Sequence, residues 1–162
     1  MKTLHAPWRI DYILGPKPGS CVFCLPEGTD EDEKRCVLHR AEHCFVIMNI
    51  FPYSNGHLMV TPFRHVSDIT ELTAAESHEV MDYVQKCAFI LQQAFRPHGL
   101  NIGVNIGEAA GAGIREHLHV HLVPRWNGDH SFMAVMSETS VLPEHLRSTY
   151  ERLKPYFDNL QR

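Results

Sequence analysis

The sequence lacks the features that would direct a protein to a membrane or to a nucleic acid. None of its apolar runs reaches the roughly 18 residues that a transmembrane helix requires, so no membrane partner is expected. Its 15 lysines and arginines are outnumbered by 19 aspartates and glutamates, and the formal net charge is −4. No Lys/Arg-rich run concentrates the positive charge, so an extended nucleic-acid partner is not expected either.

Cysteine is also scarce, with five residues in a chain of 162. An odd number of cysteines cannot pair completely, and the first residues, Met1-Lys2-Thr3-Leu4-His5, are not typical of a secretory signal peptide. These observations favour a cytoplasmic protein with free thiols over a secreted, disulfide-linked one.

The sequence contains no internal repeat, linker or low-complexity segment, and its length suits one domain with a sizeable core. Glycine, proline and charged residues dominate the beginning of the chain. We therefore expect a single domain over residues 1–162, made of an irregular N-terminal segment (1–40), a core (41–126) and a C-terminal extension with a helix (127–162).

Four β-prone runs predict strands within the core. A turn signal, Ser54-Asn55-Gly56, separates the first two runs, so they are expected to form an antiparallel pair. The predicted strands cover residues 43–48, 57–61, 100–106 and 117–123.

Two helices are predicted as well. Thr73 and Glu76 form a capping-box pattern that begins a long helix ending at about Phe95. A second, amphipathic helix is expected to begin near Pro143 and to end before Pro155. Hairpin strands with one long helix inserted indicate an α+β domain with an antiparallel sheet, here of about five strands.

The most informative stretch is residues 117–123, where His117, His119 and His121 alternate with aliphatic residues. Alternation is the period of a strand, so the three imidazoles are expected to project from one face. Histidine can act as a nucleophile, a proton donor or a metal ligand near neutral pH. A solvent-facing strand that merely carries histidine is the alternative, and three histidines at three outward positions argue against it.

At these residues the sequence resembles the histidine triad (HIT) superfamily, whose signature is His-φ-His-φ-His-φ-φ with φ hydrophobic. The resemblance covers roughly residues 5–155, and its tail most resembles bacterial diadenosine polyphosphate hydrolases and phosphorylases. It implies a HIT-like fold. The matching segments are 117–123, 49–52, 56–62, 111–113, 121–129 and Trp8-Arg9.

The resemblance implies roles for three histidines. His119, the middle histidine of the triad, attacks the α-phosphorus of a nucleotide and forms a nucleotidyl-histidine intermediate. His121 contacts the scissile phosphate and protonates the leaving group. His57 resembles a fourth histidine, which lies near the nucleotide on a neighbouring strand.

Five further residues are predicted to bind the nucleotide, together with His121. By resemblance Asn49 hydrogen-bonds the ribose, and Asn105 contacts the sugar or a phosphate. Gly111, Ala112 and Gly113 allow main-chain amides to approach the phosphates. Two simpler interpretations stay open, since Asn49 could cap the adjacent turn and the glycine-rich loop could be a mere connection.

One position departs from the resemblance. Hydrolases and phosphoramidases of the superfamily usually carry serine or threonine three residues before the first triad histidine. Here that residue is Ile114, whose side chain donates no hydrogen bond. The departure weakens the case for phosphoramidase activity.

Cys21 and Cys24 form a C-x₂-C pair, which favours zinc in a cytoplasmic protein. A redox pair is the alternative, but no βαβ pattern surrounds the two cysteines. By resemblance to other members of the superfamily, His65 and His117 complete the site. Four protein ligands fill a tetrahedron, so the expected zinc is structural.

Together these residues favour a nucleotidyl hydrolase or transferase that cleaves dinucleoside polyphosphates such as diadenosine tetraphosphate. Water as the final acceptor would make it a hydrolase, and phosphate would make it a phosphorolytic adenylyltransferase. The alternatives are a nucleoside phosphoramidase, a non-catalytic nucleotide-binding regulator, and a zinc-dependent nucleic-acid module that the net acidity disfavours.

A homodimer is expected, because superfamily members are usually dimeric. The long helix also has more apolar residues than one sheet face would bury. The alternative is that the segment after Trp126 folds back over the surplus face. The apolar residues concerned are Met81, Tyr83, Val84, Ala88, Phe89 and Leu91.

Overall fold

A computed structural model describes residues 21–129 and 142–160 of the chain. Trp8 and Arg9, which contributed to the resemblance, lie outside the described residues. Five strands form one antiparallel sheet in the order β1-β2-β3-β5-β4. The strands are β1 (Val37–Arg40), β2 (Cys44–Met48), β3 (Leu58–Pro62), β4 (Gly99–Val104) and β5 (Val120–Arg125).

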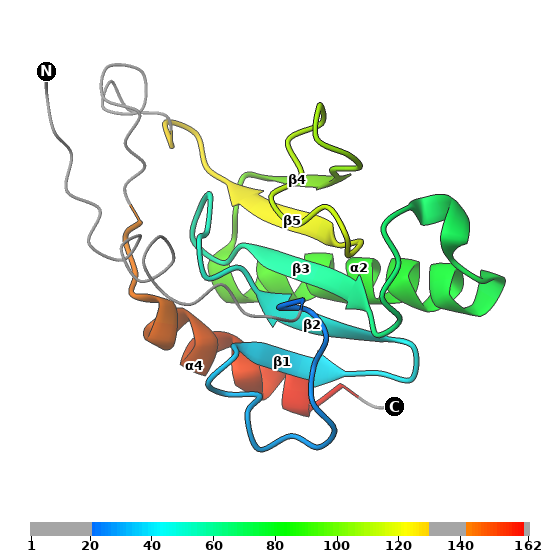
Figure 1. Ribbon diagram of the computed structural model, residues 1–162. Helices are drawn as coiled ribbons and strands as arrows, with labels where there is room; N and C mark the ends of the chain where they lie inside the picture. Colours follow the sequence, from blue (N-terminus) through cyan, green and yellow to red (C-terminus); the bar gives the residue numbers. More distant parts are fainter. Residues whose placement is uncertain (1–20, 130–141, 161–162) are drawn as a thin grey trace, which may run out of the picture.

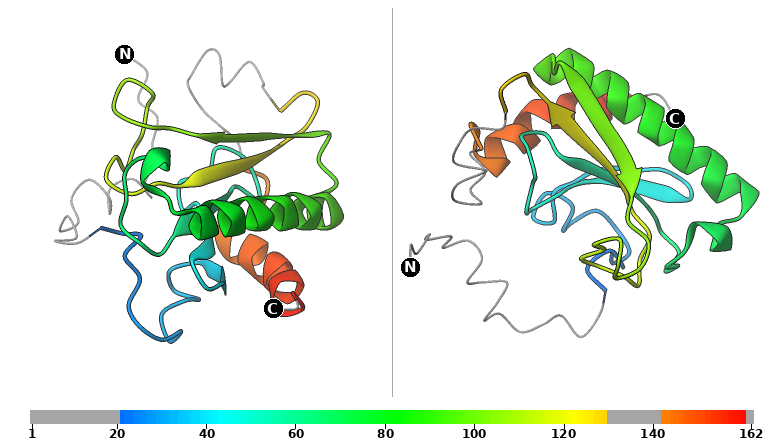
Figure 2. Two further views of the ribbon diagram at one scale, coloured as in Figure 1. Left: turned by 90° about the vertical axis from the view of Figure 1, so that its right-hand side faces the viewer. Right: turned by 90° about the horizontal axis from the view of Figure 1, so that it is seen from above.

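Two α-helices, α2 (Ala74–Phe95) and α4 (Leu146–Asp158), cover one face of this sheet (Figures 1 and 2). A short 3₁₀ helix, η1 (Ile69–Glu71), precedes α2. The predicted α+β fold, with an antiparallel sheet of about five strands, one long helix and a C-terminal helix, is confirmed.

Strand β2 separates two apolar clusters because every one of its residues is buried. Cys44, Val46 and Met48 face the helices and belong to the larger cluster. Phe45 and Ile47 point to the opposite face, where Phe23 of the N-terminal segment packs on them. Within the described residues, Phe23 and its neighbours therefore cover part of the sheet face that the helices leave open.

The long helix forms as its sequence predicts. Thr73 is the N-cap, its side chain accepts from the Glu76 amide, and the Glu76 side chain accepts from the Thr73 amide. The helix ends at Phe95, where Arg96 adopts a left-handed conformation. Within the described residues, no helix is long and apolar enough to cross a membrane.

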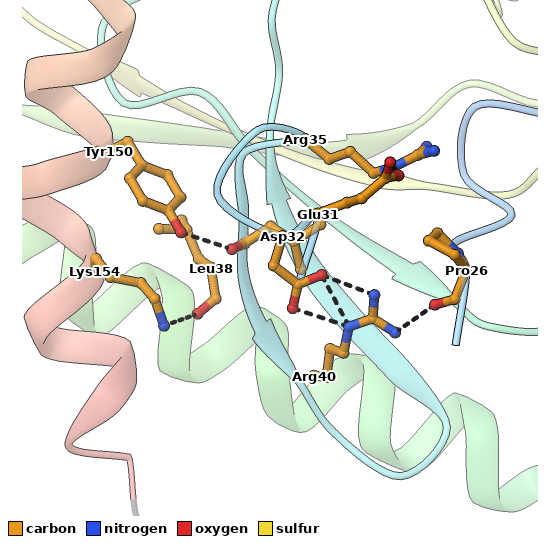
Figure 3. Close-up of polar contacts among 9 residues, drawn as sticks. Pro26, Glu31, Asp32, Arg35, Leu38, Arg40, Tyr150 and Lys154 are labelled. Carbon is orange, nitrogen blue, oxygen red and sulfur yellow. Dashed lines mark hydrogen bonds and ion pairs between the residues drawn. The ribbon is translucent and has the colours of Figure 1, made fainter. Parts of the chain in front are cut away.

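The prediction that residues 1–40 are irregular was wrong for β1. This strand is only four residues long and its pairing with β2 contains a register shift, so the sequence alone carries a weak signal for it. Its outer edge is covered by side chains, as Figure 3 shows: the Tyr150 hydroxyl donates to the Val37 carbonyl at 3.2 Å, and Lys154 donates to the Leu38 carbonyl at 3.3 Å. Arg40 also holds the N-terminal loop through Asp32.

Two strand boundaries also differ from the prediction. The triad strand begins at Val120 rather than His117, because Pro62 at the end of β3 has no N–H to continue the ladder. The amide of Leu118 donates instead to the Val66 carbonyl, at 2.7 Å. The strand expected at 100–106 covers residues 99–104.

The C-terminal helix does not stop before Pro155, as predicted, but runs from Leu146 to Asp158. Pro155 lies on the exposed side of the helix, where the carbonyl it leaves without a partner can be hydrated. On the other side Tyr150, Leu153 and Phe157 are all buried, so the apolar stripe continues past the proline.

Glu79 of α2 offers a test of how the helix holds the sheet. Its carboxylate accepts from the amides of His43 at 2.6 Å and Cys44 at 2.9 Å, just where β2 begins. We expect Glu79→Ala to lower the free energy of unfolding by about 1–3 kcal/mol, because the main-chain amides of residues 42, 43 and 44 lose a charged acceptor. Urea denaturation measures this, with Gln85→Ala on the exposed side of α2 as a control. Equal stability of the two variants would contradict the expectation.

Candidate active site and metal-ligand cluster

The structure brings the triad histidines and His57 together on the sheet face opposite the helices. His121 lies in β5 directly across from Met59 of β3, whose side chain belongs to the cluster around Phe23. His57 immediately precedes β3. The four imidazoles are buried, with exposed fractions between 1% and 8%. A solvent-facing strand that happens to carry histidine does not fit this burial.

The ring of His119 is oriented by the main chain of its own segment. Its Nδ1 lies 2.8 Å from the carbonyl oxygen of His117. A carbonyl only accepts, so Nδ1 carries the proton and Nε2 of the neutral ring carries a lone pair. Burial lowers the pKa of His119, which favours this neutral form. A neutral imidazole with its other nitrogen fixed as N–H is a competent nucleophile.

The protons of His57 and His121 are fixed by one main-chain amide. The Tyr53 amide donates to Nδ1 of His57 at 3.1 Å, so the proton of neutral His57 lies on Nε2. That Nε2 is 2.9 Å from Nδ1 of His121, which therefore accepts, and the proton of neutral His121 lies on its own Nε2. Burial lowers the pKa of His57 to about 3 and that of His121 to about 4, so both rings are neutral at neutral pH.

A lone-pair nitrogen and an N–H donor thus belong to neighbouring rings. The ring centroids of His119 and His121 are 4.7 Å apart and the rings are nearly perpendicular, at 79°. Such a pair can attack an electrophilic centre with one imidazole while the other donates to an oxygen on which negative charge develops.

The two predicted asparagines differ in their surroundings. The side-chain oxygen of Asn49 accepts from the Phe51 amide at 2.9 Å, and its amide nitrogen lies 3.4 Å from Nδ1 of His57. Asn49 therefore caps the turn next to His57, as the simpler interpretation expected, and its contact with a ribose stays a prediction. Asn105 follows β4 directly and is half-buried.

The glycine-rich loop is a hydrogen-bonded turn. The Gly111 amide donates to the Glu108 carbonyl at 2.9 Å, and the Ala112 amide donates to the Gly107 carbonyl at 3.4 Å. Gly111 has a φ of +81°, a conformation that glycine adopts without strain. Within the described residues only the Gly113 amide of the three predicted ones has no protein acceptor. Gly113 is thus the amide best placed to meet an anion.

Ile114 packs on the cluster around Phe23 instead of facing the histidines with a polar group. The side chain that replaces the usual serine or threonine therefore joins the glycine-rich loop to the N-terminal segment. No hydroxyl is available there to assist a leaving group.

The four predicted metal ligands converge. Cys21, Cys24, His65 and His117 place one ligand atom each within 4.8 Å of one another. Nδ1 of His117 lies 3.3 Å from the Cys21 sulfur and 3.9 Å from the Cys24 sulfur, and Nδ1 of His65 lies 3.3 Å from the Cys24 sulfur.

The donor chemistry of this cluster fits a tetrahedral metal. Zinc bonds of about 2.3 Å to sulfur and about 2.0–2.1 Å to nitrogen place neighbouring donors roughly 3.3–3.8 Å apart. The Nε2 of His117 donates to the Pro62 carbonyl at 2.8 Å, which leaves the lone pair on Nδ1, the atom that faces the sulfurs.

Sequence reasoning missed two aromatic residues that line the site. The centroid of the Phe23 ring lies 5.0 Å from that of the His119 ring and 5.6 Å from that of the His117 ring. The centroid of the Tyr53 ring lies 4.6 Å from that of the His57 ring and 5.8 Å from that of the His121 ring. Phe23 stands between the two cysteines of the C-x₂-C pair and Tyr53 four residues before His57, and neither position is distinctive in a single sequence.

The chain is similar to proteins of known family. It is 38% identical over 157 residues to an AP-4-A phosphorylase of Mycobacterium tuberculosis, which covers 92% of this chain and 80% of that protein. It is 32% identical over 95 residues to a bis(5'-nucleosyl)-tetraphosphatase (asymmetrical) of Schizosaccharomyces pombe, covering 59% of this chain and 52% of that one.

Among solved structures, a Zn-bound histidine triad family protein from Mycobacterium smegmatis matches with a TM-score of 0.66 and 25% identity. The match covers 86% of this chain and 94% of that one. The HIT domain model matches residues 30–128, which include His57 and all three triad histidines. The chain therefore belongs to the HIT domain family.

Proposed function

We propose that this protein cleaves dinucleoside polyphosphates, such as diadenosine tetraphosphate, at the α-phosphorus through a nucleotidyl-His119 intermediate. The observation that carries the proposal is the hydrogen bond from Nδ1 of His119 to the His117 carbonyl, beside the N–H of His121. The similarity to the M. tuberculosis AP-4-A phosphorylase over most of the chain supports the substrate class.

The first chemical step uses both rings. The Nε2 lone pair of His119 forms a bond to the α-phosphorus, and the bond from phosphorus to the bridging oxygen breaks. The leaving nucleoside polyphosphate takes the electron pair, and its oxyanion accepts the hydrogen bond of His121 Nε2, which keeps its proton because the ring is neutral. In this proposal the Gly113 amide donates to a phosphate oxygen, and Asn49 and Asn105 contact the sugar.

The second step releases the nucleotide. An acceptor oxygen attacks the α-phosphorus, the bond to His119 breaks, and its electron pair returns to Nε2. An attacking orthophosphate oxyanion has no proton to lose, and an attacking water would lose its proton to solvent. We propose orthophosphate as the acceptor, because a relative that matches 92% of the chain is a phosphorylase. Water is the alternative, as in the tetraphosphatase that matches a shorter segment.

Product analysis separates the two acceptors. Diadenosine tetraphosphate with orthophosphate would yield ATP and ADP by phosphorolysis, and ATP and AMP by hydrolysis. Nucleoside phosphoramidase activity is disfavoured by Ile114, and a regulator without turnover is disfavoured by the orientation of His119.

The nucleophile gives the first functional prediction. His119→Ala should reduce turnover by at least about 10³-fold, because the covalent intermediate cannot form. Nucleotide affinity, measured by calorimetry, should change little. His78→Ala, an exposed histidine on α2, is the control. Near-native turnover in His119→Ala, or failure to trap labelled nucleotide on the wild-type protein, would overturn the mechanism.

We further propose that Cys21, Cys24, His65 and His117 hold a structural zinc ion. When bound, the ion would supply four ligand bonds that join the N-terminal segment to the loop after β3 and to the triad. The donor distances and the similarity to a Zn-bound relative support this assignment.

Purified protein should therefore contain about one zinc ion per chain. Cys24→Ser should lose the metal and much of its stability, since metal binding is linked to folding. Metal analysis and thermal unfolding measure the two effects. As a control, Cys87→Ala in the buried core should lose stability and keep the metal. Protein purified without chelator and free of zinc would contradict the assignment.

We also propose that the protein is a homodimer that uses α2. Helix α4 contacts α2, yet Met81 and Phe89 stay 56% and 65% exposed, so the C-terminal segment described by the structure does not cover them. Val84, by contrast, is buried in the core and is not available to a partner.

Light scattering should give a mass near twice the 18.5 kDa of one chain. Phe89→Asp should shift the protein to monomer while leaving the fold intact, because the side chain is mostly exposed in one chain. Gln85→Asp, an exposed polar residue on α2, is the control. A wild-type mass of one chain at micromolar concentration would exclude the dimer.

A further inference from the structure

The turn that precedes His57 controls the His57–His121 pair. Tyr53, in this turn, donates its main-chain N–H to His57 Nδ1, and its ring packs on the same imidazole. The His57 amide donates in turn to the Ser54 carbonyl at 3.3 Å. If the turn moves, Nδ1 of His57 loses the nearer of its two donors and keeps only the longer contact of 3.4 Å with the Asn49 side-chain amide. The proton is then less strictly confined to Nε2.

Residues of the C-terminal segment hold this turn from outside the sheet. The side-chain amide of Asn55 donates to a Glu144 carboxylate oxygen at 3.3 Å. The Thr149 hydroxyl lies 3.1 Å from the side-chain oxygen of Asn55 and 2.8 Å from the same Glu144 oxygen. The other oxygen of Glu144 accepts from Arg152 at 2.6 Å. Each polar atom of the Asn55 side chain therefore has a partner in the C-terminal segment.

The contact is anchored by buried residues of the C-terminal extension. Thr149 is 2% exposed, and the next residue, Tyr150, is anchored in the core with Leu153 and Phe157. The HIT domain match ends at residue 128, so Glu144 and Thr149 lie beyond it. The helix face that packs on the sheet thus also holds Thr149, and Glu144 just before the helix, against the turn that precedes His57.

We propose that Glu144 and Thr149 are positioning residues for catalysis. Through Asn55 they keep the Tyr53 amide on His57, so that His57 donates to His121 and His121 keeps its proton on Nε2. The expected effect on the catalytic rate rests on the proposed function. The expected effect on the positions of the imidazole protons does not.

The test removes the hydroxyl of Thr149 while keeping its shape. Thr149→Val should lower kcat with diadenosine tetraphosphate by about tenfold or more with KM nearly unchanged, because small displacements of catalytic groups reduce rate steeply. In ¹⁵N spectra of the imidazoles at neutral pH, His57 should change from the Nε2–H form to a mixture of tautomers. Thr149→Ser, which keeps the hydroxyl, should restore both properties.

Two further variants separate positioning from stability. Asn55→Ala breaks the contact from the side of the turn, and it should reproduce the loss of kcat and the mixed tautomers even if Thr149→Val fails to fold. Leu153→Ala weakens the packing of α4 without touching Asn55. It should lower the melting temperature while the tautomers and kcat stay native below it.

Native tautomers and native kcat in Asn55→Ala would overturn the inference. Failure of the proposed function and failure of the positioning role give different results. A wild-type protein without turnover would overturn the proposed function, whereas the imidazole spectra test the positioning role without substrate.

Discussion

The hydrogen bond between Nδ1 of His119 and the His117 carbonyl is the constraint on which the site depends, because it decides which nitrogen can act as a nucleophile. Neither residue belongs to the ladder of β5, so strand pairing does not fix their geometry. The segment is instead held from the loop after β3. The last residue of β3 supplies the Pro62 carbonyl for the His117 ring, and the loop supplies the Val66 carbonyl for the Leu118 amide.

His117 therefore connects two functions of the molecule. Its side chain is the most buried donor of the metal-ligand cluster, and its carbonyl orients the nucleophile. The loop after β3 also carries His65 of the metal-ligand cluster, and it is tied to α2 through Arg64, which forms two 2.8 Å contacts with Glu76. Arg64 holds the pKa of Glu76 at about 2, so this ion pair is intact at neutral pH. The capping residue of the long helix thus also braces the loop that supports the nucleophile.

What could be predicted from the sequence was encoded locally. The capping box at Thr73, the alternation at residues 117–123 and the spacing of the two cysteines each lie within a few residues, and the structure contains the corresponding helix, face and cluster. Features that depend on distant partners were missed. Strand β1 exists because it pairs with β2, and the triad strand begins late because Pro62 ends the facing ladder. The aromatic neighbours of the histidines were missed for the same reason.

Burial explains why the histidines of this site are neutral and why the fold loses stability at acidic pH. Desolvation keeps His57, His119 and His121 neutral, so that one ring keeps its lone pair while another remains an N–H donor. A histidine with a folded pKa below the unfolded value of about 6.5 binds a proton more readily in the unfolded chain. The stability that the neutral, buried ring contributes is therefore fully present above about pH 6.5. It is lost as the pH falls toward about 4 for His121 and about 3 for His57. The desolvation that keeps these rings neutral therefore also makes the fold less stable as the pH falls below about 6.5.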